Sequence, residues 1–583
     1  MEFRAYNACK AEKAGGGKKH PVLRGNFMQP GAFKGYSAEK MKSHLQAMYD
    51  IGIDILVLQW SFENTSEGVT NVYYRSSFEA ADKSTVYNAS GENLLGNILE
   101  AAEAVGVKVF VGLNNNDEWW EKAVSDKAWL TAQAELGIKG AKQLYATYKK
   151  QYPNAFYGWY FVFEMYNTAA TREMMENGAY LLNGFCDGLT EIDAGMPMML
   201  SPFLSAYGTE PEVTGQQWKE IFSMTHFREG DIFCCQDSVG AGFITVDQLD
   251  GYFKAIKEAV DTKKGLHFWA NNEDFDQASW GTAPLDRFVK QLQISDPYVE
   301  AHITFAYSHH QHPDMGKAGH HEAYKYYYEN GKLPSYDLAS PTVEYEVGGE
   351  GVSIRGTIPN ENKGAMGFRI YKNGELLKLI NLTKDYDKSL LSFNFTDTVA
   401  GAGSVAYKVC AVDYRYRDGA YSEFTVNGWT FPALNYQIRK ALPSDAEQLK
   451  ELYFHHLTHY PPTEEQNMEQ WRALLSKFLQ DDNMHLLVLE IEDRIVSTVQ
   501  MAIVENLTHN VRPFAVIENV VTHADYRNQG YASALLQKAS EIAKERCCYK
   551  LFLETGSNKE STLNFYRNNG FEIDQKHSCL KRL

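Results

Sequence analysis

Residues 526–535 read Tyr-Arg-Asn-Gln-Gly-Tyr-Ala-Ser-Ala-Leu and stand between two segments of opposite character. The apolar run 514–521 before them has the composition of a β-strand, and residues 532–544 after them have the spacing of an amphipathic helix. A strand, a glycine turn and a helix in this order direct a row of backbone N–H groups towards an anion in front of the helix. The stretch therefore predicts an anion-binding loop in a mixed α/β domain.

A resemblance to a known family identifies this anion. The motif Arg527-x-x-Gly530-x-Ala532 resembles the pyrophosphate-binding loop of the GNAT family of N-acetyltransferases, and residues 558–571 resemble the final motif of that family. The order of expected strands and helices over residues 436–583 matches a GNAT domain, an α+β fold, along nearly all of its length. The resemblance therefore implies acetyl-CoA as the cofactor, with its diphosphate as the anion.

The resemblance also implies which positions hold the cofactor. The strand before the loop would pair with the pantetheine arm through backbone groups, and the loop would give its N–H groups to the diphosphate. Gly530 is expected because a side chain there would block the close approach of the ligand. The positions concerned are Val520, Val521 and Thr522 on the strand, Arg527, Asn528, Gln529, Gly530, Tyr531 and Ala532 in the loop, and Asn558 beside the pantetheine.

Two further residues are candidates for catalysis in this domain. The resemblance implies that Tyr566 protonates the departing CoA thiolate. The amine nucleophile must arrive neutral, so a general base is needed, directly or through water, and Glu518 at the end of the preceding strand is the candidate. The alternative for Glu518 is a surface carboxylate or one that orients the substrate. The alternative for the whole domain is a degenerate copy that no longer turns over.

Residues 25–335 alternate apolar runs with helical patterns. Eight strands alternating with helices over about 300 residues predict a (β/α)8 TIM barrel. The alternative is a doubly wound open sheet, which the absence of a glycine-rich dinucleotide fingerprint after the first strand makes weaker. The runs are 25–29, 53–60, 107–113, 156–163, 198–204, 231–236, 266–270 and 302–307, and helical patterns include 37–49, 93–105, 136–148 and 246–257.

Polar and aromatic residues crowd the expected carboxyl ends of these strands, where barrel chemistry takes place. Acids can act on a glycosidic bond, amides bind hydroxyl groups and indoles stack on sugar faces, so the composition predicts a carbohydrate site. The candidate residues are Trp60, Glu63, Asn114, Glu164, Asp237, Trp269, Asn272, Glu273 and His309.

The barrel region also resembles known proteins. It is similar to the large clan of retaining glycosidases, and more closely to an uncharacterised bacterial family of glycosidase-like barrels often followed by a β-sandwich. The clan resemblance implies Glu164 after strand 4 as acid/base and Glu273 after strand 7 as nucleophile, with carboxyl groups about 5 Å apart if the enzyme is retaining. The clan has Asn directly before its acid, whereas this chain has Phe163, so Asp237 and Glu63 stay open as candidates. Each acid has the alternative role of binding substrate or capping a helix.

A group of histidines follows the last expected strand. His309, His310 and His312 lie close together, with His320 and His321 nearby, but the cluster has no H-E-x-x-H motif and no cysteine partner. We therefore expect a polar rim loop and no metal.

The texture of the sequence changes after Pro334. Short alternating runs separated by turn residues predict an all-β sandwich over residues 336–428. The stretch 407–413 followed by Gly419-x-Tyr421-Ser422 resembles the last two strands of a fibronectin type III domain, which has an immunoglobulin-like fold. The chain is thus expected to contain an N-terminal extension (1–24), the barrel (25–335), the sandwich (336–428), a short linker and the acetyltransferase domain (436–583).

Composition excludes several classes of function. The formal net charge of −17 over 583 residues argues against binding to a nucleic-acid backbone. No run of eighteen apolar residues predicts a membrane span, and residues 1–20 lack the apolar core of a secretory signal. Eight cysteines make no disulfide framework and suit a reducing compartment, so we expect a cytoplasmic protein.

Together these features predict an acetyl-CoA-dependent N-acetyltransferase fused to a glycoside hydrolase barrel, acting on carbohydrate or amino-sugar substrates. In the alternative, the barrel is a non-catalytic glycan-binding module and the GNAT domain acetylates a protein, a polyamine or another amine. The sequence does not fix the sugar, the acceptor amine or the oligomeric state.

Overall fold

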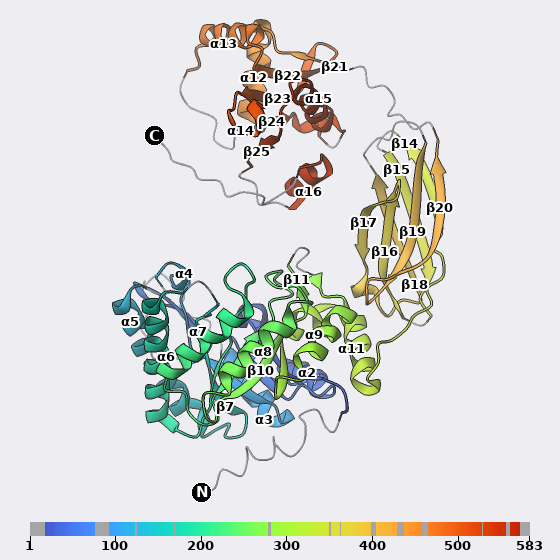
Figure 1. The fold of residues 1–583 in the computed structure, drawn as a ribbon. Helices are drawn as coiled ribbons and strands as arrows, with labels where there is room; N and C mark the ends of the chain where they lie inside the picture. Colours follow the sequence, from blue (N-terminus) through green and yellow to red (C-terminus); the bar gives the residue numbers. More distant parts are fainter. Residues whose placement is uncertain are drawn as a thin grey trace.

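The computed structural model places three groups of elements along the chain: a parallel barrel, a pair of antiparallel sheets and a five-stranded sheet with helices (Figure 1). Residues 1–17, the segment 428–435, Asn528 and Asn558, for which the sequence makes predictions, lie outside the described residues. The structure describes residues 18–75, 93–122, 125–167, 170–277, 281–348, 351–361, 363–397, 404–427, 436–457, 465–527, 529–555 and 560–571.

Eight parallel strands close into a barrel in the order β1-β13-β10-β9-β8-β7-β5-β2. This closure confirms the predicted eight-stranded parallel barrel and excludes the open sheet. The strands are β1 (Leu23–Met28), β2 (Ile55–Leu58), β5 (Lys108–Gly112), β7 (Phe156–Phe161), β8 (Met198–Leu200), β9 (Ile232–Gln236), β10 (His267–Glu273) and β13 (Ala301–Phe305). The surrounding helices are α2 (Ala38–Tyr49), α3 (Leu94–Val105), α5 (Lys127–Leu144), α6 (Arg172–Asp193), α7 (Pro211–Met224), α8 (Leu249–Val260), α9 (Leu285–Ser295) and α11 (Ala318–Asn330).

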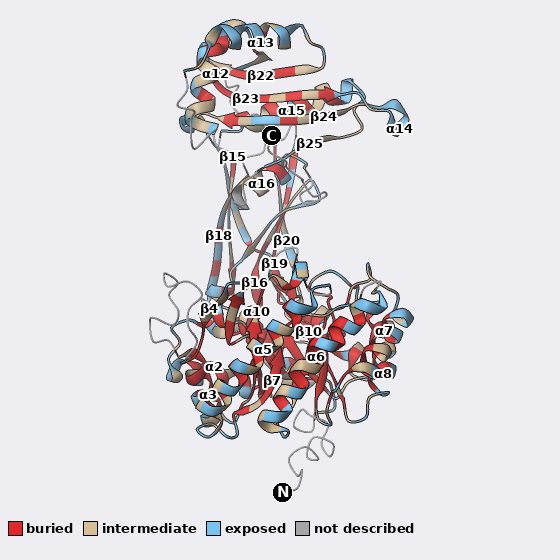
Figure 2. Ribbon diagram, turned by 90° about the vertical axis from the view of Figure 1, so that its left-hand side faces the viewer, coloured by how far each residue is buried: buried red, intermediate tan, exposed pale blue. Residues whose placement is uncertain are grey.

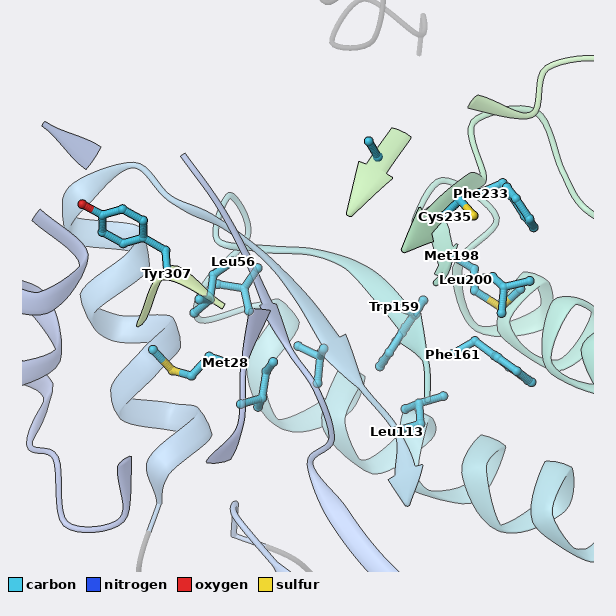
Figure 3. Close-up of a cluster of buried hydrophobic side chains, with 14 of the residues drawn as sticks. Met28, Leu56, Leu113, Trp159, Phe161, Met198, Leu200, Phe233, Cys235 and Tyr307 are labelled. Atoms are coloured by element: carbon cyan, nitrogen blue, oxygen red, sulfur yellow. The ribbon is translucent and has the colours of Figure 1, made fainter. Parts of the chain in front are cut away.

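Strand residues alternate between two apolar layers, as the pleat of a strand requires. Leu56, Trp159 and Phe161 point outward into the layer beneath the helices, which Figure 3 shows in close-up. Their neighbours Val57 and Tyr160 point inward and fill the barrel. The helices expose their outer faces and bury the faces that meet the strands (Figure 2).

Two boundaries in the barrel differ from the sequence predictions. The helix expected from residue 136 begins at Lys127, because Asp126 accepts a hydrogen bond from the backbone N–H of Trp129 at 3.0 Å and caps an earlier start. The strand expected over residues 198–204 ends at Leu200, two residues before Pro202, which has no N–H to give to a ladder.

Small elements after the strand ends build the rim of the barrel. One three-stranded sheet has the order β4-β3-β6, and a two-stranded hairpin joins β11 to β12 after β10. These elements are β3 (Phe62–Thr65), β4 (Gly68–Val72), β6 (Asn114–Asn115), β11 (Phe275–Asp276), β12 (Gly281–Thr282), α4 (Trp119–Lys122), α10 (Tyr307–His310), η1 (Pro30–Phe33) and η3 (Pro313–Met315), whereas η2 (Tyr145–Lys149) continues α5 before β7.

Seven strands after the barrel form two antiparallel sheets around one apolar core. Ile354 and Phe393 from the first sheet pack in the same cluster as Phe368 and Tyr407 from the second. Two sheets with a shared core are an all-β arrangement, and the fibronectin type III assignment stays a prediction. The first sheet contains β14 (Thr342–Gly348), β15 (Gly351–Pro359) and β18 (Leu390–Asp397), and the second contains β17 (Glu375–Asn381), β16 (Ala365–Lys372), β19 (Val405–Asp413) and β20 (Asp418–Val426), with η4 (Thr383–Asp385) between β17 and β18.

One end of this pair of sheets is fixed to the barrel. The Tyr416 hydroxyl donates to the carbonyl of Thr282 at 3.0 Å, and the N–H of Leu285 donates to the carbonyl of Tyr414 at 3.2 Å. The Tyr414 ring covers Gly319, where a Cβ would lie only 1.8 Å from the tyrosine hydroxyl. The contact therefore supports the segment that joins β10 to α9.

The C-terminal group is a five-stranded sheet in the order β21-β22-β23-β24-β25, with helices on both faces. One apolar cluster packs α15 and α16 on the sheet, and a second packs α12 and α13 on its other face. This arrangement confirms the predicted mixed α/β domain. The elements are β21 (Tyr436–Lys440), β22 (Met484–Ile491), β23 (Arg494–Val504), β24 (Phe514–Thr522), β25 (Leu551–Leu553), α12 (Ala446–Leu452), α13 (Met468–Gln480), α14 (Thr508–Val511), α15 (Tyr531–Glu545), α16 (Glu560–Asn568), η5 (Pro443–Asp445), η6 (Tyr453–Leu457) and η7 (Ala524–Tyr526).

Within the described ranges, no helix has the length and apolar character that crossing a bilayer requires.

Candidate functional site

In the C-terminal sheet the ladder between two parallel strands ends early, and we call the strand edge beyond it, with the loop that follows, the cleft. The ladder between β24 and β25 joins residues 515–517 to 551–553 and then stops, while β24 continues to Thr522. On its other side, β24 shifts register against β23 at a bulge, where Asn519 adopts a φ of 53°. In the described part of the chain, the edge of β24 beyond Ile517 is therefore open to an extended ligand, and this edge holds Val520, Val521 and Thr522 as predicted.

The glycine loop follows this edge and starts helix α15. Gly530 has a φ of 81° and is the N-cap of α15, and the first helical bond runs from the N–H of Ala534 to its carbonyl. The N–H groups of Tyr531 and Ala532 therefore have no acceptor within the helix, and the first turn contains no acidic side chain. This loop fits a diphosphate. A Cβ at Gly530 would meet no protein atom within 4 Å, so the left-handed backbone is what demands glycine here.

Arg527 shapes the loop from outside. Its Nε donates to the carbonyl of Thr522 at 3.1 Å, and its terminal nitrogen donates to the carbonyl of His456 at 3.2 Å. The guanidinium thus ties the end of β24 to η6. The Gln529 side chain is held in the loop as well, because it donates to the carbonyl of Asp525 at 3.3 Å.

The two catalytic candidates of this domain occupy different environments. Tyr566 on α16 is 8% exposed and packs against Phe565 and Phe571, and burial raises the pKa of its hydroxyl. Its phenol is therefore protonated at neutral pH and able to donate a proton. Glu518 is exposed on the open part of β24, opposite Gln500.

In the barrel, two acids face the interior at the carboxyl ends of the strands. Trp269 packs inside the barrel, and the period of two along β10 places Asn271 and Glu273 on the same side. From β9, Gln236 donates to Oε1 of Glu164 at 3.1 Å. Because Gln236 pairs with Asn271 in the ladder between β9 and β10, the structure brings the two predicted catalytic acids to the same end of the barrel interior.

Burial governs the charge of this pair. It raises the pKa of Glu164, although the hydrogen bond from Gln236 opposes the shift. It raises the pKa of Glu273 well above the ordinary range, helped by the charges of Asp237 and Glu164 and opposed by the N–H of Ala241, which donates to Oε2 at 2.7 Å. Burial and the mutual repulsion of these neighbouring carboxyl groups thus both favour their protonated forms.

Asp237 lies behind this pair rather than on the rim. It is fully buried, and its Oδ2 accepts from Asn272 at 2.9 Å and from Gln291 at 2.7 Å. Its Oδ1 accepts from the backbone N–H groups of Val239 and Glu273, both at 3.2 Å. With its oxygens engaged in this way, Asp237 supports the backbone that carries Glu273.

Asn272 also differs from its predicted contact with substrate. Its side chain donates to Ser295 on α9 at 3.2 Å as well as to Asp237, and its oxygen bonds His302 at 2.9 Å. Because it directly follows Asn271 on the strand, it must point to the opposite face. Asn114 also packs against a helix instead of facing the predicted substrate: it is buried against α5 and donates to the side chain of Gln133 at 3.0 Å.

The remaining predicted barrel residues have mixed positions. Glu63 lies in the rim sheet on β3, where it accepts from Trp60 at 2.9 Å and from Tyr73 at 3.0 Å. Trp269 is 8% exposed and lies below the acids. His309 accepts from the N–H of Gln29 at 3.2 Å, and burial lowers its pKa to about 4, which keeps it neutral.

One candidate metal cluster includes a residue that the sequence analysis missed, His44 on α2. Its ligand atoms lie within 4.8 Å of those of His312 and Asp314. However, His312 accepts from the N–H of Asp314 and bonds the carbonyl of His44, both at 3.1 Å, while His44 bonds Asp314 at 3.0 Å and Ser308 at 3.2 Å. Both nitrogens of each ring are engaged, so the cluster is a hydrogen-bonded network.

Sequence reasoning also missed Gln236 and Asn271 as lining residues of the barrel mouth. The signal was present, because each stands two residues after a residue that fills the barrel interior: Cys234 on β9 and Trp269 on β10.

Comparison with known proteins matches two separate parts of the chain to families. Residues 23–317, just over half of the chain, match the profile described as "Domain of unknown function (DUF4434)", and residues 446–571 match the Acetyltransferase (GNAT) family. The glucosamine 6-phosphate N-acetyltransferase of Trypanosoma brucei brucei is 32% identical over 87 residues, which are 15% of this chain and 57% of that protein. The chain thus spans little more than half the length of this curated relative.

Solved acetyltransferases cover the same part of the chain. A Trypanosoma brucei acetyltransferase is 27% identical and covers 25% of this chain and 100% of its own, with a TM-score of 0.23. The glucosamine-6-phosphate N-acetyltransferase of Arabidopsis thaliana is 21% identical and covers 25% and 98%, also with a TM-score of 0.23. The chain belongs to the DUF4434 family and carries a C-terminal GNAT acetyltransferase domain, whose acyl donor is acetyl-CoA.

Proposed function

We propose that the C-terminal domain transfers the acetyl group of acetyl-CoA to the amine of an amino sugar. The observation that carries this proposal is the open edge of β24 beside the left-handed Gly530 and the N-terminus of α15. The curated relative over this region is an amino-sugar acetyltransferase by name, which supports this class of acceptor. Use of acetyl-CoA also supports a cytoplasmic location, where that cofactor is available.

We assign a different role to each group of residues in the cleft. Backbone groups of Val520–Thr522 would hold the pantetheine arm, and the N–H groups of Tyr531 and Ala532 would hold the diphosphate. Acetyl-CoA supplies the acetyl group as a thioester. The carboxylate of Glu518 would take a proton from the attacking amine, and the protonated hydroxyl of Tyr566 would give its proton to the leaving sulfur.

A panel of acceptors tests this proposal. The full chain is incubated with acetyl-CoA and, separately, with glucosamine, glucosamine 6-phosphate, galactosamine, spermidine or a lysine peptide, and thiol release is measured. We expect turnover with at least one amino sugar. Turnover with only the polyamine or the peptide would support the alternative acceptors, and acetyl-CoA binding without acetylation of any amine would contradict a catalytic role.

We further propose that the barrel hydrolyses a glycoside. The supporting observation is that Glu164 and Glu273 face the same interior end of the barrel, where burial raises the pKa of both acids. In the resemblance to retaining glycosidases, Glu164 would protonate the glycosidic oxygen and Glu273 would attack the sugar. The N–H of Ala241 favours the ionised Glu273 that this step needs and opposes the effect of burial on its pKa.

The rival is a barrel that binds glycans without cleaving them. The two functions are distinguished by assaying the full chain with aryl glycosides of common hexoses and amino sugars, in both anomeric forms. Release of the aryl group, lost in Glu164→Gln with binding retained, supports hydrolysis. Sugar binding without release by the unmodified protein supports a binding module.

A further inference from the structure

Four aromatic side chains gather on one side of the barrel rim. Trp120, Tyr166, Phe203 and Phe243 stand on the segments that follow the neighbouring strands β5, β7, β8 and β9. Tyr166 stacks on Phe203 with ring centroids 4.8 Å apart and planes 11° apart. The centroids of Trp120 and Phe243 lie 6.2 Å and 5.7 Å from that of Phe203. We call these four residues the aromatic platform.

The outer members of the platform face solvent. Trp120 is 57% exposed, Tyr166 is 44% exposed and Phe243 is 37% exposed, whereas Phe203 is half-buried between them. Single exposed aromatics are common, but contiguous ones on a folded surface mark sites of binding. The platform therefore needs an occupant.

The platform continues the wall of the barrel mouth outward from the acids. Tyr166 stands two residues after Glu164, and Phe203 stands two residues after Ser201. Ser201 belongs to the mouth, because its hydroxyl accepts a hydrogen bond from Asn271 at 3.2 Å. Both rings of the stacked pair therefore stand within two residues of the barrel mouth along the chain.

Backbone and side-chain bonds hold the platform in place. Tyr166 pairs with Phe203 as an isolated parallel bridge, and the N–H of Phe203 donates to the carbonyl of Met165 at 3.0 Å. The buried Asn167 accepts from the N–H of Ser205 at 2.7 Å and donates to the carbonyl of the same residue at 3.0 Å. A surface held in this way loses little conformational entropy when a ligand binds.

The chemistry of the mouth identifies the occupant as a carbohydrate. Each sugar ring has faces of C–H groups that pack on aromatic rings, while its hydroxyl groups bond amides, carboxyls and water. We propose that the platform binds the sugar unit next to the one held between Glu164 and Glu273, so that the barrel acts on chains of two or more units. This inference rests on the proposed carbohydrate site of the barrel and extends it to a second subsite.

The dependence of affinity on chain length tests the platform. The probes are β-1,4-linked oligomers of glucosamine and of N-acetylglucosamine, and of glucose, each with one to four units, titrated calorimetrically into the full chain carrying Glu164→Gln to prevent cleavage. We expect affinity to rise from one unit to two or three in at least one series. Tyr166→Ala or Trp120→Ala should lower the affinity for the longer oligomers roughly three- to tenfold, which is the range that aromatic contacts supply.

Matched variants separate stacking from other effects. Tyr166→Phe keeps the ring and should keep the gain with chain length. Tyr207→Ala removes an aromatic side chain that is 88% exposed on the neighbouring loop and should change nothing. Because Trp120 and Tyr166 are largely exposed, their truncation should leave the unfolding temperature close to that of the unmodified protein.

The outcomes distinguish the platform from the proposed hydrolysis. The platform is overturned if Tyr166→Ala and Trp120→Ala do not lower the affinity for longer sugar oligomers. If the protein also releases the aryl group from a one-sugar glycoside, the proposed role of the acids is still supported. A gain with length that these variants remove, without any hydrolysis, supports the platform and contradicts hydrolysis. No binding in any series overturns the platform. It is also overturned if sedimentation shows that the protein self-associates and that both variants dissociate the assembly, because the aromatic residues would then form a protein interface.

Discussion

The barrel mouth and the C-terminal cleft are built from different chemical groups. The mouth presents carboxyl side chains whose burial raises their pKa, as at Glu164 and Glu273. The cleft presents backbone N–H groups, at the open edge of β24 and at the start of α15 after Gly530. A site of buried side chains depends on the identity of each residue, whereas a site of backbone groups depends on the conformation of the chain. Mutations should therefore affect the two sites in different ways.

The largest expected effect is on the mouth. Glu164→Gln or Glu273→Gln keeps the size of the side chain but removes an acid, so the kcat of glycoside hydrolysis should fall by at least about a thousandfold. Acetylation by the same protein should not change. Initial rates of both reactions in one preparation measure this, with Asp117→Asn as the control acid exposed on the same rim. Equal activity in Glu164→Gln and the unmodified protein would show that Glu164 takes no part in the reaction.

Tyr566→Phe should have the next largest effect, this time on the cleft. The variant keeps the buried ring and loses the hydroxyl proton, so the kcat of acetyl transfer should fall by about a hundredfold. Binding of acetyl-CoA, measured by calorimetry, should stay the same because backbone groups hold the cofactor. Tyr549→Phe, elsewhere in the same domain, is the control. A weaker affinity with an unchanged kcat would mean that Tyr566 binds rather than reacts.

The two sites also differ in how far the sequence could predict them. The glycine loop is local: one strand, one turn and one helix appear in order, and the structure places them as expected. The barrel strands were recognisable from their apolar runs. Which face each polar residue takes was harder to predict, because Asp237, Asn272 and Asn114 lie in or after strands whose inward-facing positions the residue types alone do not reveal.

A known inward residue would have resolved part of this problem. Once Trp269 is placed inside the barrel, the period of two puts Asn271 and Glu273 inside and Asn272 outside. The aromatic platform required more, since its members come from four separate segments that only barrel closure brings together. Long-range pairing of this kind leaves no pattern within any one segment.

The pH dependence of stability should differ between the buried Asp274 and an acid exposed on the surface of the barrel. Burial raises the pKa of Asp274 to about 7. A raised folded-state pKa gives stability that is complete below the unfolded value near 4 and is lost as the pH rises through about 7. Asp274→Asn has no such loss, so the stability of the variant relative to the unmodified protein should be about 4 kcal/mol greater at pH 8 than at pH 4.

Thermal unfolding at both pH values measures this difference, and Asp247→Asn, whose side chain is 92% exposed, serves as the control. If both variants respond to pH in the same way, Asp274 is ionised in the folded protein across this range.

The smallest effect tests the conformational character of the cleft. Gly530 and Gly570 have nearly the same φ, 81° and 82°, and a Cβ at either would meet no protein atom within 4 Å. Alanine at each position should therefore cost a similar strain, roughly 1–2 kcal/mol. Only Gly530 stands at the start of α15, so only Gly530→Ala should also weaken acetyl-CoA binding, by about tenfold, while kcat at saturating cofactor stays constant. Calorimetric titration of both variants decides the point: an equal loss of affinity in Gly570→Ala would show that general strain, and not the direction of the loop N–H groups, controls binding.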